Sequence, residues 1–377
     1  MKITRLDTFH VLPRWLFLRI ETDAGIHGWG EPIVEGFARS TESIVHELGE
    51  FLVGQDPRRI EYLWQAMYRG NFYRGGPHLM SAISGIEQAL WDIKGKSLGV
   101  PVYELFGGVY RESVRTYAHC MDYAKDGALS DARRLVDAGF DAIKIGVSAP
   151  VASIPTAAFI ESEADRIFAV RSEVGPEVDV ALDLHGRFSP DAAIRLITAV
   201  ADAQLMFIEE PCLPENIPAM ARIRDTTGAT LATGERLFTR WQFREIIEQQ
   251  IVSVVQPDLC HSGGIAEARR IAAMAETYYA TVAPHNPLGP ISLASCLQLA
   301  VCTPNFLIQE HPSLLDGSDL GVGLAETPFA VVEGRIARPT GPGLGIELDM
   351  AAIKDRAYDG AWKTPQLRQA DGAVADW

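Results

Sequence analysis

The sequence has 377 residues, of which 47% are hydrophobic, and its mean hydropathy is +0.04. This length and composition predict a globular protein with room for two domains. The net charge of −15 and the pI of about 5.1 argue against nucleic acid or an anionic membrane as a partner. No apolar stretch reaches membrane-spanning length and no signal segment precedes the first strand pattern. The five cysteines form no Cys-x-x-Cys pair, so we expect reduced, mostly buried thiols in a soluble cytoplasmic protein.

Residues 1–110 are predicted to form a separate α+β capping domain. Short runs with strand alternation come first and helical periods follow, over 3–12, 16–21 and 26–30 for the strands and 41–52, 57–68 and 79–98 for the helices. Two polar-aromatic loops stand out, one at Arg14-Trp15 and one at 71–76 with Tyr73. Ordinary surface turns and a lid over a substrate explain these loops equally well.

Residues 111–325 are predicted to form a parallel α/β barrel. Short apolar runs, each the length of a buried strand, alternate with helix-length amphipathic segments. Ionisable residues end six consecutive runs at steps of 26, 26, 23, 27 and 25 residues, about one strand-plus-helix unit each, at Asp183, Glu209, Glu235, Asp258, His285 and Glu310. The first two strands are predicted at 114–120 and 142–145. Residues 326–377, with a hairpin of 330–336 and 344–348, are expected to return to the capping domain.

Asp183, Glu209 and Glu235 are carboxylates at equal spacing. The carboxyl ends of all strands open on one face of a barrel, so these side chains are expected to converge there. Three ionised carboxylates repel one another unless a cation lies between them. An all-oxygen ligand set suits a hard ion, and Mg²⁺ leaves coordination positions for substrate oxygens. Helix caps or ordinary ion pairs are the alternative interpretation, and the repeated spacing favours the metal site over it.

Several motifs resemble the enolase superfamily, mandelate racemase subgroup, and the likeness covers nearly the whole chain. They are Asp183-x-His185-Gly186-Arg187, Glu209-Glu210-Pro211, Gly234-Glu235-Arg236, Gln256-Pro257-Asp258, His285-Asn286-Pro287 and Gln309-Glu310. The resemblance implies a modified TIM barrel, (β/α)7β, with an N-terminal α+β capping domain. It also implies one Mg²⁺ per subunit, a small-molecule acid-sugar substrate, and a homo-oligomer, with octamers common among relatives.

The resemblance also implies catalytic roles for four residues. His285, supported by Asp258, is the base that removes the proton next to the substrate carboxylate. His185 follows Asp183 by two residues, so strand alternation is expected to keep it near the metal, where it protonates a leaving hydroxyl. Glu310 is expected to donate a proton to a substrate carboxylate oxygen.

The second barrel strand departs from the family pattern. Many relatives carry Lys-x-Lys there, with the second lysine as a base, whereas this chain has Lys144-Ile145-Gly146. His285 is therefore the expected base, and Lys144 is expected to bind substrate or to neutralise the carboxylates. Arg14, Trp15 and Tyr73 are the further candidates for substrate binding.

The implied reaction is the Mg²⁺-dependent dehydration of a six-carbon aldonate, with D-galactonate as the leading substrate. The C2 proton and the C3 hydroxyl leave, giving a 2-keto-3-deoxy acid. Another acid sugar such as gluconate, or racemisation or epimerisation with the same two histidines, stays open because the loops at 119–126, at 147–155 and after Glu310 depart from expectation. A non-catalytic acid-sugar-binding protein is disfavoured, since the carboxylates and both histidines are intact.

Overall fold

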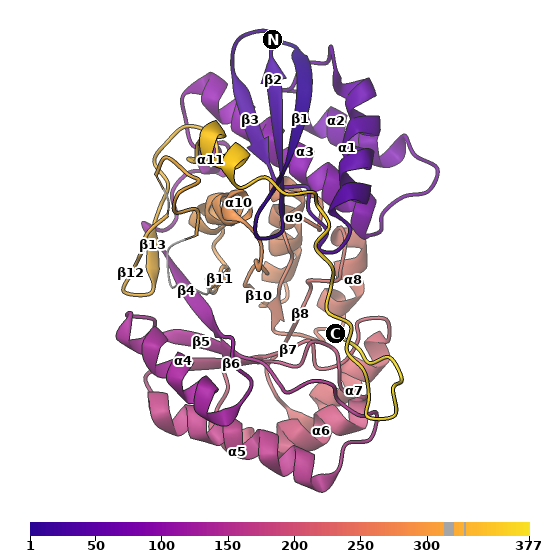
Figure 1. Cartoon of the computed structure of the whole chain (residues 1–377), viewed down its shortest axis with the longest axis vertical. Helices are drawn as coiled ribbons and strands as arrows, with labels where there is room; N and C mark the ends of the chain where they lie inside the picture. Colours follow the sequence, from indigo (N-terminus) through magenta and orange to yellow (C-terminus); the bar gives the residue numbers. More distant parts are fainter. Residues whose placement is uncertain (313–319, 328) are drawn as a thin grey trace.

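The computed structural model describes residues 1–312, 320–327 and 329–377. Residues 313–319 and 328, which follow Glu310 in the stretch expected to depart from the family, lie outside this description. The chain begins with an antiparallel sheet backed by helices, seen in indigo and purple at one end of the molecule (Figure 1). The strands are β1 (Ile3–Val11), β2 (Trp15–Thr22) and β3 (His27–Gly30), and the helices are α1 (Ala38–Leu52), α2 (Ile60–Arg69) and α3 (Pro77–Leu98).

A parallel barrel follows a short 3-10 turn, η1 (Val102–Phe106). Its strands are β4 (Ser113–Cys120), β5 (Ala142–Ile145), β6 (Asp179–Asp183), β7 (Ile208–Glu209), β8 (Leu231–Thr233), β9 (Val254–Val255), β10 (Thr281–Val282) and β11 (Gln309–His311). Its helices are α4 (Lys125–Asp137), α5 (Ala157–Val174), α6 (Pro190–Ala199), α7 (Ile217–Thr227), α8 (Arg240–Glu248), α9 (Ile265–Glu276) and α10 (Pro290–Cys302), with a further 3-10 turn, η2 (Ala201–Ala203).

The ring of strands closes on itself. The strands pair in sequence order from β4 to β10, a bridge between Val282 and Phe306 leads toward β11, and β11 pairs in parallel with β4. Within the described ranges this makes eight parallel strands and seven intervening helices, so the predicted (β/α)7β barrel is confirmed. The last strand lies later in the sequence than expected, so Glu310 is inside β11 and not directly after it.

The interior of the barrel is a packed apolar plug. Each strand, or the residue beside it, contributes one buried side chain: Tyr117, Ala142, Ala181, Phe207, Ala232, Val254, Ala283 and Ile308. Four of the eight are alanines, and their small volume leaves room for the bulky Tyr117 and Phe207. The plug keeps the barrel from being a pore, so any ligand must bind on top of it at the carboxyl ends of the strands.

Helix α3 forms a polar seam between the capping domain and the barrel. Glu87 of α3 accepts hydrogen bonds from the first amides of α9, at 2.8 Å from Ile265 and 2.9 Å from Ala266. Asp92 accepts from the backbone of Leu344 at 2.8 Å and pairs with Lys96 at 2.8 Å. Both carboxylates are fully buried. Glu87 therefore joins the capping domain to the barrel, and Asp92 joins it to the C-terminal segment, through directional hydrogen bonds.

The same seam includes Glu31, which follows β3. Its two carboxylate oxygens accept from Gly289 at 2.7 Å and from Ser292 at 2.9 Å, at the start of α10. Its own amide donates to Gln88 of α3 at 2.9 Å. Glu31 of the capping domain therefore accepts hydrogen bonds from amides at the N-terminus of α10 that have no acceptor within the helix.

The C-terminal segment differs from the predicted hairpin. β12 (Val331–Val332) and β13 (Arg335–Ala337) form a tight hairpin, and β13 pairs with β4 of the barrel. Its turn consists of Glu333 and Gly334, which both have positive φ, 49° and 65°, as a two-residue hairpin requires. Residues 344–348 are not a strand, so the predicted second half of the hairpin was wrong. α11 (Met350–Asp355) follows, and a long tail then crosses from the capping domain to the barrel (Figure 1).

Within the described ranges, no helix is both long and apolar enough to cross a membrane. All five cysteines are buried and free.

Candidate active site

Three carboxylates meet at the ends of neighbouring strands. Asp183 and Glu209 are the last residues of β6 and β7 and are register partners in the parallel sheet. Glu235 follows β8 after Gly234, whose backbone lies so close to Gln256 that an added Cβ would stand 2.7 Å from its carbonyl carbon. Only glycine fits this position, and it directs Glu235 into the site. The predicted convergence of the three acids is therefore seen in the fold.

Lys144 of β5 lies among these carboxylates. Its Nζ is 2.9 Å from Glu209 Oε2, 2.7 Å from Glu310 Oε1 and 3.4 Å from Asp183 Oδ2. Burial opposes the charge on the lysine, but the surrounding carboxylates outweigh it and hold the pKa of Lys144 well above its usual value. Of the two roles expected for Lys144, neutralising the cluster agrees with this geometry.

The donor set fits a hard divalent cation. Glu209 Oε1 is buried and has no hydrogen-bond partner among the described residues, so a buried oxygen faces the site with its lone pairs unused. Asp183 and Glu235 add further oxygens. Cys120 is in the same cavity wall, but burial raises the pKa of its thiol to about 12, so it offers no thiolate to favour a softer ion. Among the described residues, no group of His, Cys, Asp or Glu side chains is arranged to hold a metal ion. Lys144 contacts Glu209, and His285 contacts Glu235.

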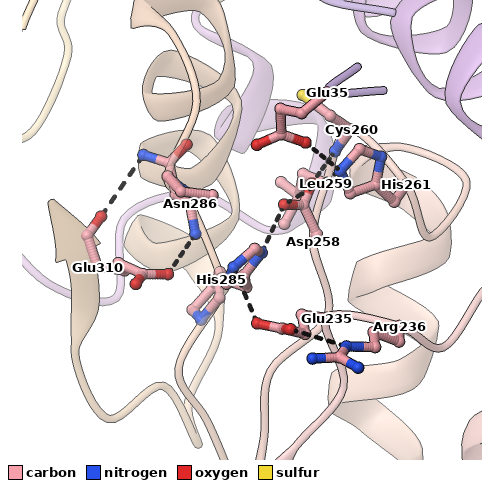
Figure 2. A network of polar contacts seen from close by, with 12 residues as sticks. Glu35, Glu235, Arg236, Asp258, Leu259, Cys260, His261, His285, Asn286 and Glu310 are labelled. Atoms are coloured by element: carbon pink, nitrogen blue, oxygen red, sulfur yellow. Dashed lines mark hydrogen bonds and ion pairs between the residues drawn. The ribbon is translucent and has the colours of Figure 1, made fainter. Parts of the chain in front are cut away.

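His285 and Asp258 form a hydrogen-bonded pair beside Glu235 (Figure 2). His285 Nδ1 lies 2.8 Å from Asp258 Oδ2, and Nε2 lies 3.1 Å from Glu235 Oε2. The other oxygen of Asp258 accepts from the Cys260 amide at 2.6 Å, which fixes the carboxylate behind the ring. Burial lowers the pKa of His285, but Glu310 and Glu235 outweigh burial and raise it well above its usual value. The pair holds the ring so that Nε2 faces the site.

His185 reaches the site through its backbone conformation. β6 ends at Asp183, and His185 has a φ of 52°, in the left-handed backbone region that few non-glycine residues adopt. Its amide donates to Asp183 Oδ1 at 2.8 Å, and its carbonyl accepts from Arg236 Nη2 at 2.7 Å. Its Nδ1 is 3.6 Å from Asp183 Oδ2. The expected nearness to Asp183 is present, but the reason given for it, strand alternation, was wrong.

Glu310 is surrounded by hydrogen-bond donors. It receives bonds from the Asn286 amide at 2.6 Å, from Lys144 at 2.7 Å and from His119 Nε2 at 2.5 Å (Figure 2 shows the Asn286 contact). Burial raises the pKa of Glu310, but Lys144, His285 and His119 outweigh burial and hold it well below its usual value. The expectation of a protonated, donating Glu310 disagrees with this arrangement, because each neighbour favours the ionised form.

One cavity of about 470 Å³ brings most of the predicted residues together. Its wall includes Arg14, Lys144, Asp183, His185, Glu235, His285 and Glu310. Arg14 reaches it from the capping domain and is held by the Pro287 carbonyl at 3.2 Å and by Glu35 at 3.6 Å. Glu209 and Asp258 lie behind this wall, fully buried.

Two predicted substrate-binding residues are not part of the wall. Trp15 is 5% exposed and stacks on Phe17 at 5.8 Å within an apolar cluster that the capping domain shares with the barrel. Tyr73 is 87% exposed on the loop after α2. The cavity wall includes Pro77, at the start of α3, as its contribution from this part of the chain.

Among the wall residues that sequence reasoning missed are His119, Tyr123 and Trp377. His119 is the β4 register partner of Lys144, so the rule applied to the later strand ends would have found it on the first strand. Tyr123 packs against Gly146, where an added Cβ would stand 2.5 Å from its ring, which explains why this chain has no second lysine there. Trp377 carries no such signal, because only the path of the tail brings it to the cavity.

The capped barrel, the carboxylate cluster and the His–Asp pair together point to one class of enzymes. Comparison with known protein families identifies that class. A model described as the mandelate racemase / muconate lactonizing enzyme N-terminal domain matches residues 8–107, and one described as enolase C-terminal domain-like matches residues 127–352. The chain belongs to the enolase superfamily, in its mandelate racemase subgroup. It is an enzyme, and members of this superfamily generally bind Mg²⁺.

Individual relatives narrow the likeness further. The chain is 46% identical to D-galactonate dehydratase of Ralstonia nicotianae over 383 residues and 43% identical to that of Cronobacter sakazakii over 382, with each pair covered in full. A solved enolase from Agrobacterium radiobacter with bound Na and L-malate has a TM-score of 0.92 at 32% identity, and both chains are fully covered. A member of the enolase superfamily from Salmonella Typhimurium has a TM-score of 0.86 at 32% identity, with 94% of this chain and 97% of that chain covered.

Proposed function

We propose that this enzyme is an Mg²⁺-dependent acid-sugar dehydratase whose substrate is D-galactonate. The observation that carries the proposal is one cavity in which His185 and His285, from different strand ends, face the same carboxylate cluster. The full-length likeness to D-galactonate dehydratases supports the choice of substrate. In this account residues 1–110 cap the site, residues 111–325 carry the catalytic groups, and residues 326–377 close back over both units.

The two histidines divide the chemistry. Asp258 holds Nδ1 of His285, and Glu235, which raises the pKa of His285 through its contact with Nε2, would be drawn to the metal when it binds. Nε2 would then be free to take the proton from C2 of the substrate. The hydroxyl on C3 then leaves as water with a proton from His185, because hydroxide is a poor leaving group without a donor. The resulting enol takes up a proton at C3 and becomes the 2-keto-3-deoxy acid. The net change is the loss of one water molecule.

Asp183, Glu209 and Glu235 would hold the metal, and the unpartnered Glu209 Oε1 is the oxygen best placed to contribute. When bound, Mg²⁺ supplies positive charge against the substrate carboxylate, which lowers the cost of removing the adjacent proton. Before the metal binds, Lys144 balances part of the negative charge of the site, since its Nζ lies within 3.4 Å of Asp183, Glu209 and Glu310.

The remaining polar groups of the wall position the substrate. Glu310 fixes Lys144 and His119 by accepting from both, so it orders the end of the cavity where the substrate carboxylate belongs. Arg14 adds a cation from the capping domain, held in place by the Pro287 carbonyl. A substrate bound here is enclosed by both domains, which excludes water from the reacting carbons.

The test is a panel of acid sugars incubated with the purified enzyme and Mg²⁺, with 2-keto acids detected by derivatisation and identified by NMR. We expect D-galactonate to give 2-keto-3-deoxygalactonate with the highest kcat/KM of the panel. A panel in which no aldonate gives a 2-keto acid would overturn the proposal. Exchange of the C2 proton without loss of water would instead identify a racemase or epimerase.

A further inference from the structure

The tail after α11 links the two domains beside the catalytic cavity. Ala357 bridges to Val11 of β1, and the ring of Trp362 lies 4.9 Å from the guanidinium carbon of Arg14. Further along, the Gln369 side chain donates to the Val151 carbonyl of the barrel at 2.8 Å. Figure 1 shows this segment in yellow, running from α11 down to the barrel. The tail is therefore attached to the capping domain at one end and to a barrel loop at the other.

The last part of the tail has its own local structure. Arg368 and Val374 form an antiparallel bridge, the Gln369 amide donates to the Ala373 carbonyl at 2.8 Å, and the Ala375 amide donates to the Leu367 carbonyl at 3.0 Å. A second cavity of about 790 Å³ separates this turn from barrel residues such as Val151 and Phe188. The turn thus holds its shape without packing tightly on the barrel, and it presents the residues that follow it to the catalytic site.

Trp377 is the part of the tail that reaches the catalytic cavity. Its indole is a component of the cavity wall, and the ring centre lies 6.3 Å from that of His185, with the planes inclined at 42°. The side chain is 41% exposed, so much of its surface is free to contact a ligand. An indole offers a large, rigid apolar face that packs against the C–H groups of a sugar chain and keeps water away from them.

We propose that Trp377 is a specificity-determining residue that contacts the acid sugar from C3 outward. This inference rests on the proposed function, in which His185 protonates the hydroxyl on C3. Because the indole stands beside His185, the substrate atoms nearest to it are C3 and the carbons that follow. The configuration at C4 then decides whether a C–H group or a hydroxyl faces the ring, and a hydroxyl there loses hydrogen bonds to water without replacement. The indole discriminates between C4 epimers in this way.

D-Galactonate and D-gluconate are C4 epimers with the same configuration at C2 and C3, so they test the proposal directly. We would measure kcat/KM for both acids with Mg²⁺ in the wild type, in Trp377→Ala and in Trp377→Phe. The ratio of the two values should change about tenfold or more in Trp377→Ala, the range expected when an apolar pocket loses a discriminating contact. Trp377→Phe, which keeps an aromatic face, should retain most of the wild-type ratio.

The matched control is Trp241→Ala on α8. Trp241 is 44% exposed, a fraction similar to the 41% of Trp377. Its ring stacks on Tyr68, with the ring centres 5.3 Å apart, outside the catalytic cavity. In Trp241→Ala, the ratio of kcat/KM for D-galactonate to kcat/KM for D-gluconate should equal that of the wild type. A general loss of folding would lower both kcat/KM values and leave their ratio unchanged. An unchanged ratio in Trp377→Ala, with an active wild type, overturns this inference alone. A wild type that dehydrates neither acid overturns the proposed function, and this inference with it.

Discussion

Two regions of the molecule bury acidic side chains, and they neutralise them in opposite ways. At the domain seam, Glu31 and Glu87 accept hydrogen bonds from backbone amides at the starts of α10 and α9. At the barrel mouth, Asp183, Glu235 and Glu310 face the ionisable side chains of Lys144, His185 and His285. The difference follows from the partners: backbone amides are neutral, whereas the side chains of lysine and protonated histidine carry positive charge.

The pKa values of the two regions diverge accordingly. Burial raises the pKa of Glu31 to about 8 and that of Glu87 to about 7, because neutral amides only partly offset the loss of water. At the mouth, burial acts in the same direction, but positively charged neighbours outweigh it and lower the pKa of Asp183 and of Glu235. At Glu209 burial outweighs Lys144, and the pKa is raised well above its usual value. Asp183 and Glu235, which are kept ionised in the cavity, are available for chemistry.

The histidines of the mouth should show the largest effects. His285→Asn should lose both dehydration and exchange of the C2 proton with solvent deuterium, whereas His185→Asn should lose dehydration and keep the exchange. Each dehydration rate should fall by about 10²–10⁴, the contribution of a general acid or base. Proton NMR of D-galactonate in D₂O reports both events, after circular dichroism shows that each variant is folded. Exchange that survives in His285→Asn and vanishes in His185→Asn would mean that the two roles are reversed.

At the seam, Asp92→Ala should cost stability. The change removes one of the two acid partners of the half-buried Lys96, which keeps Glu347, and leaves the Trp29 and Leu344 amides, which bond to Asp92 at 2.9 and 2.8 Å, without an acceptor. We expect a loss of about 2–5 kcal/mol in the free energy of unfolding, measured by urea denaturation, because each unsatisfied buried amide costs about 1–3 kcal/mol. Glu173→Ala, which removes an exposed partner of Arg133, serves as the control and should leave the urea midpoint close to wild type. Equal midpoints for the two variants would contradict a structural role for the seam.

Glu87 should make stability pH-dependent in a direction set by its raised pKa. The pKa of Glu87 rises from 4.5 to about 7 in the folded state. Between pH 4.5 and pH 7 the folded protein therefore keeps a proton that the unfolded chain releases. The stabilisation is complete below pH 4.5 and is lost as the pH rises through 7. Glu87→Gln cannot titrate, so the wild-type advantage in unfolding free energy should shrink between pH 5 and pH 8, by on the order of 2 kcal/mol. A constant difference across this range would show that Glu87 stays ionised in the fold.

The strand-end acids were predictable because a barrel imposes a regular period on the chain. Asp183 and Glu209 lie at consecutive strand ends as expected, and the spacing of ionisable residues also located Asp258 and His285. His185 was placed near Asp183 for the wrong reason, since a positive φ, and not strand alternation, turns it toward the site. Backbone conformation after a strand end is set by local contacts such as the Arg236 bond to its carbonyl, which no periodic pattern records.

Residues brought in by long loops were not predictable in the same way. Trp15 lies between two strands and was a candidate for substrate contact, yet its ring is buried against Phe17 because the antiparallel sheet turns it into the core. Trp377 stands in the catalytic cavity because the tail makes a bridge at Ala357 and a turn at 368–374, contacts that depend on the finished fold. The periodic sequence pattern therefore predicts the side chains at the strand ends of the barrel. It does not predict side chains such as Trp15 and Trp377, whose positions depend on tertiary contacts.

The central claim is that the carboxylates of the mouth, unlike those of the seam, hold a metal that the reaction requires. The direct test is Mg²⁺ titration of EDTA-treated enzyme while D-galactonate dehydration is followed, for the wild type and for Glu209→Gln. We expect no turnover in excess EDTA, full recovery with Mg²⁺ in the wild type, and both a higher Mg²⁺ requirement and a lower maximal rate in Glu209→Gln. Full activity of the wild type in excess EDTA would contradict the account.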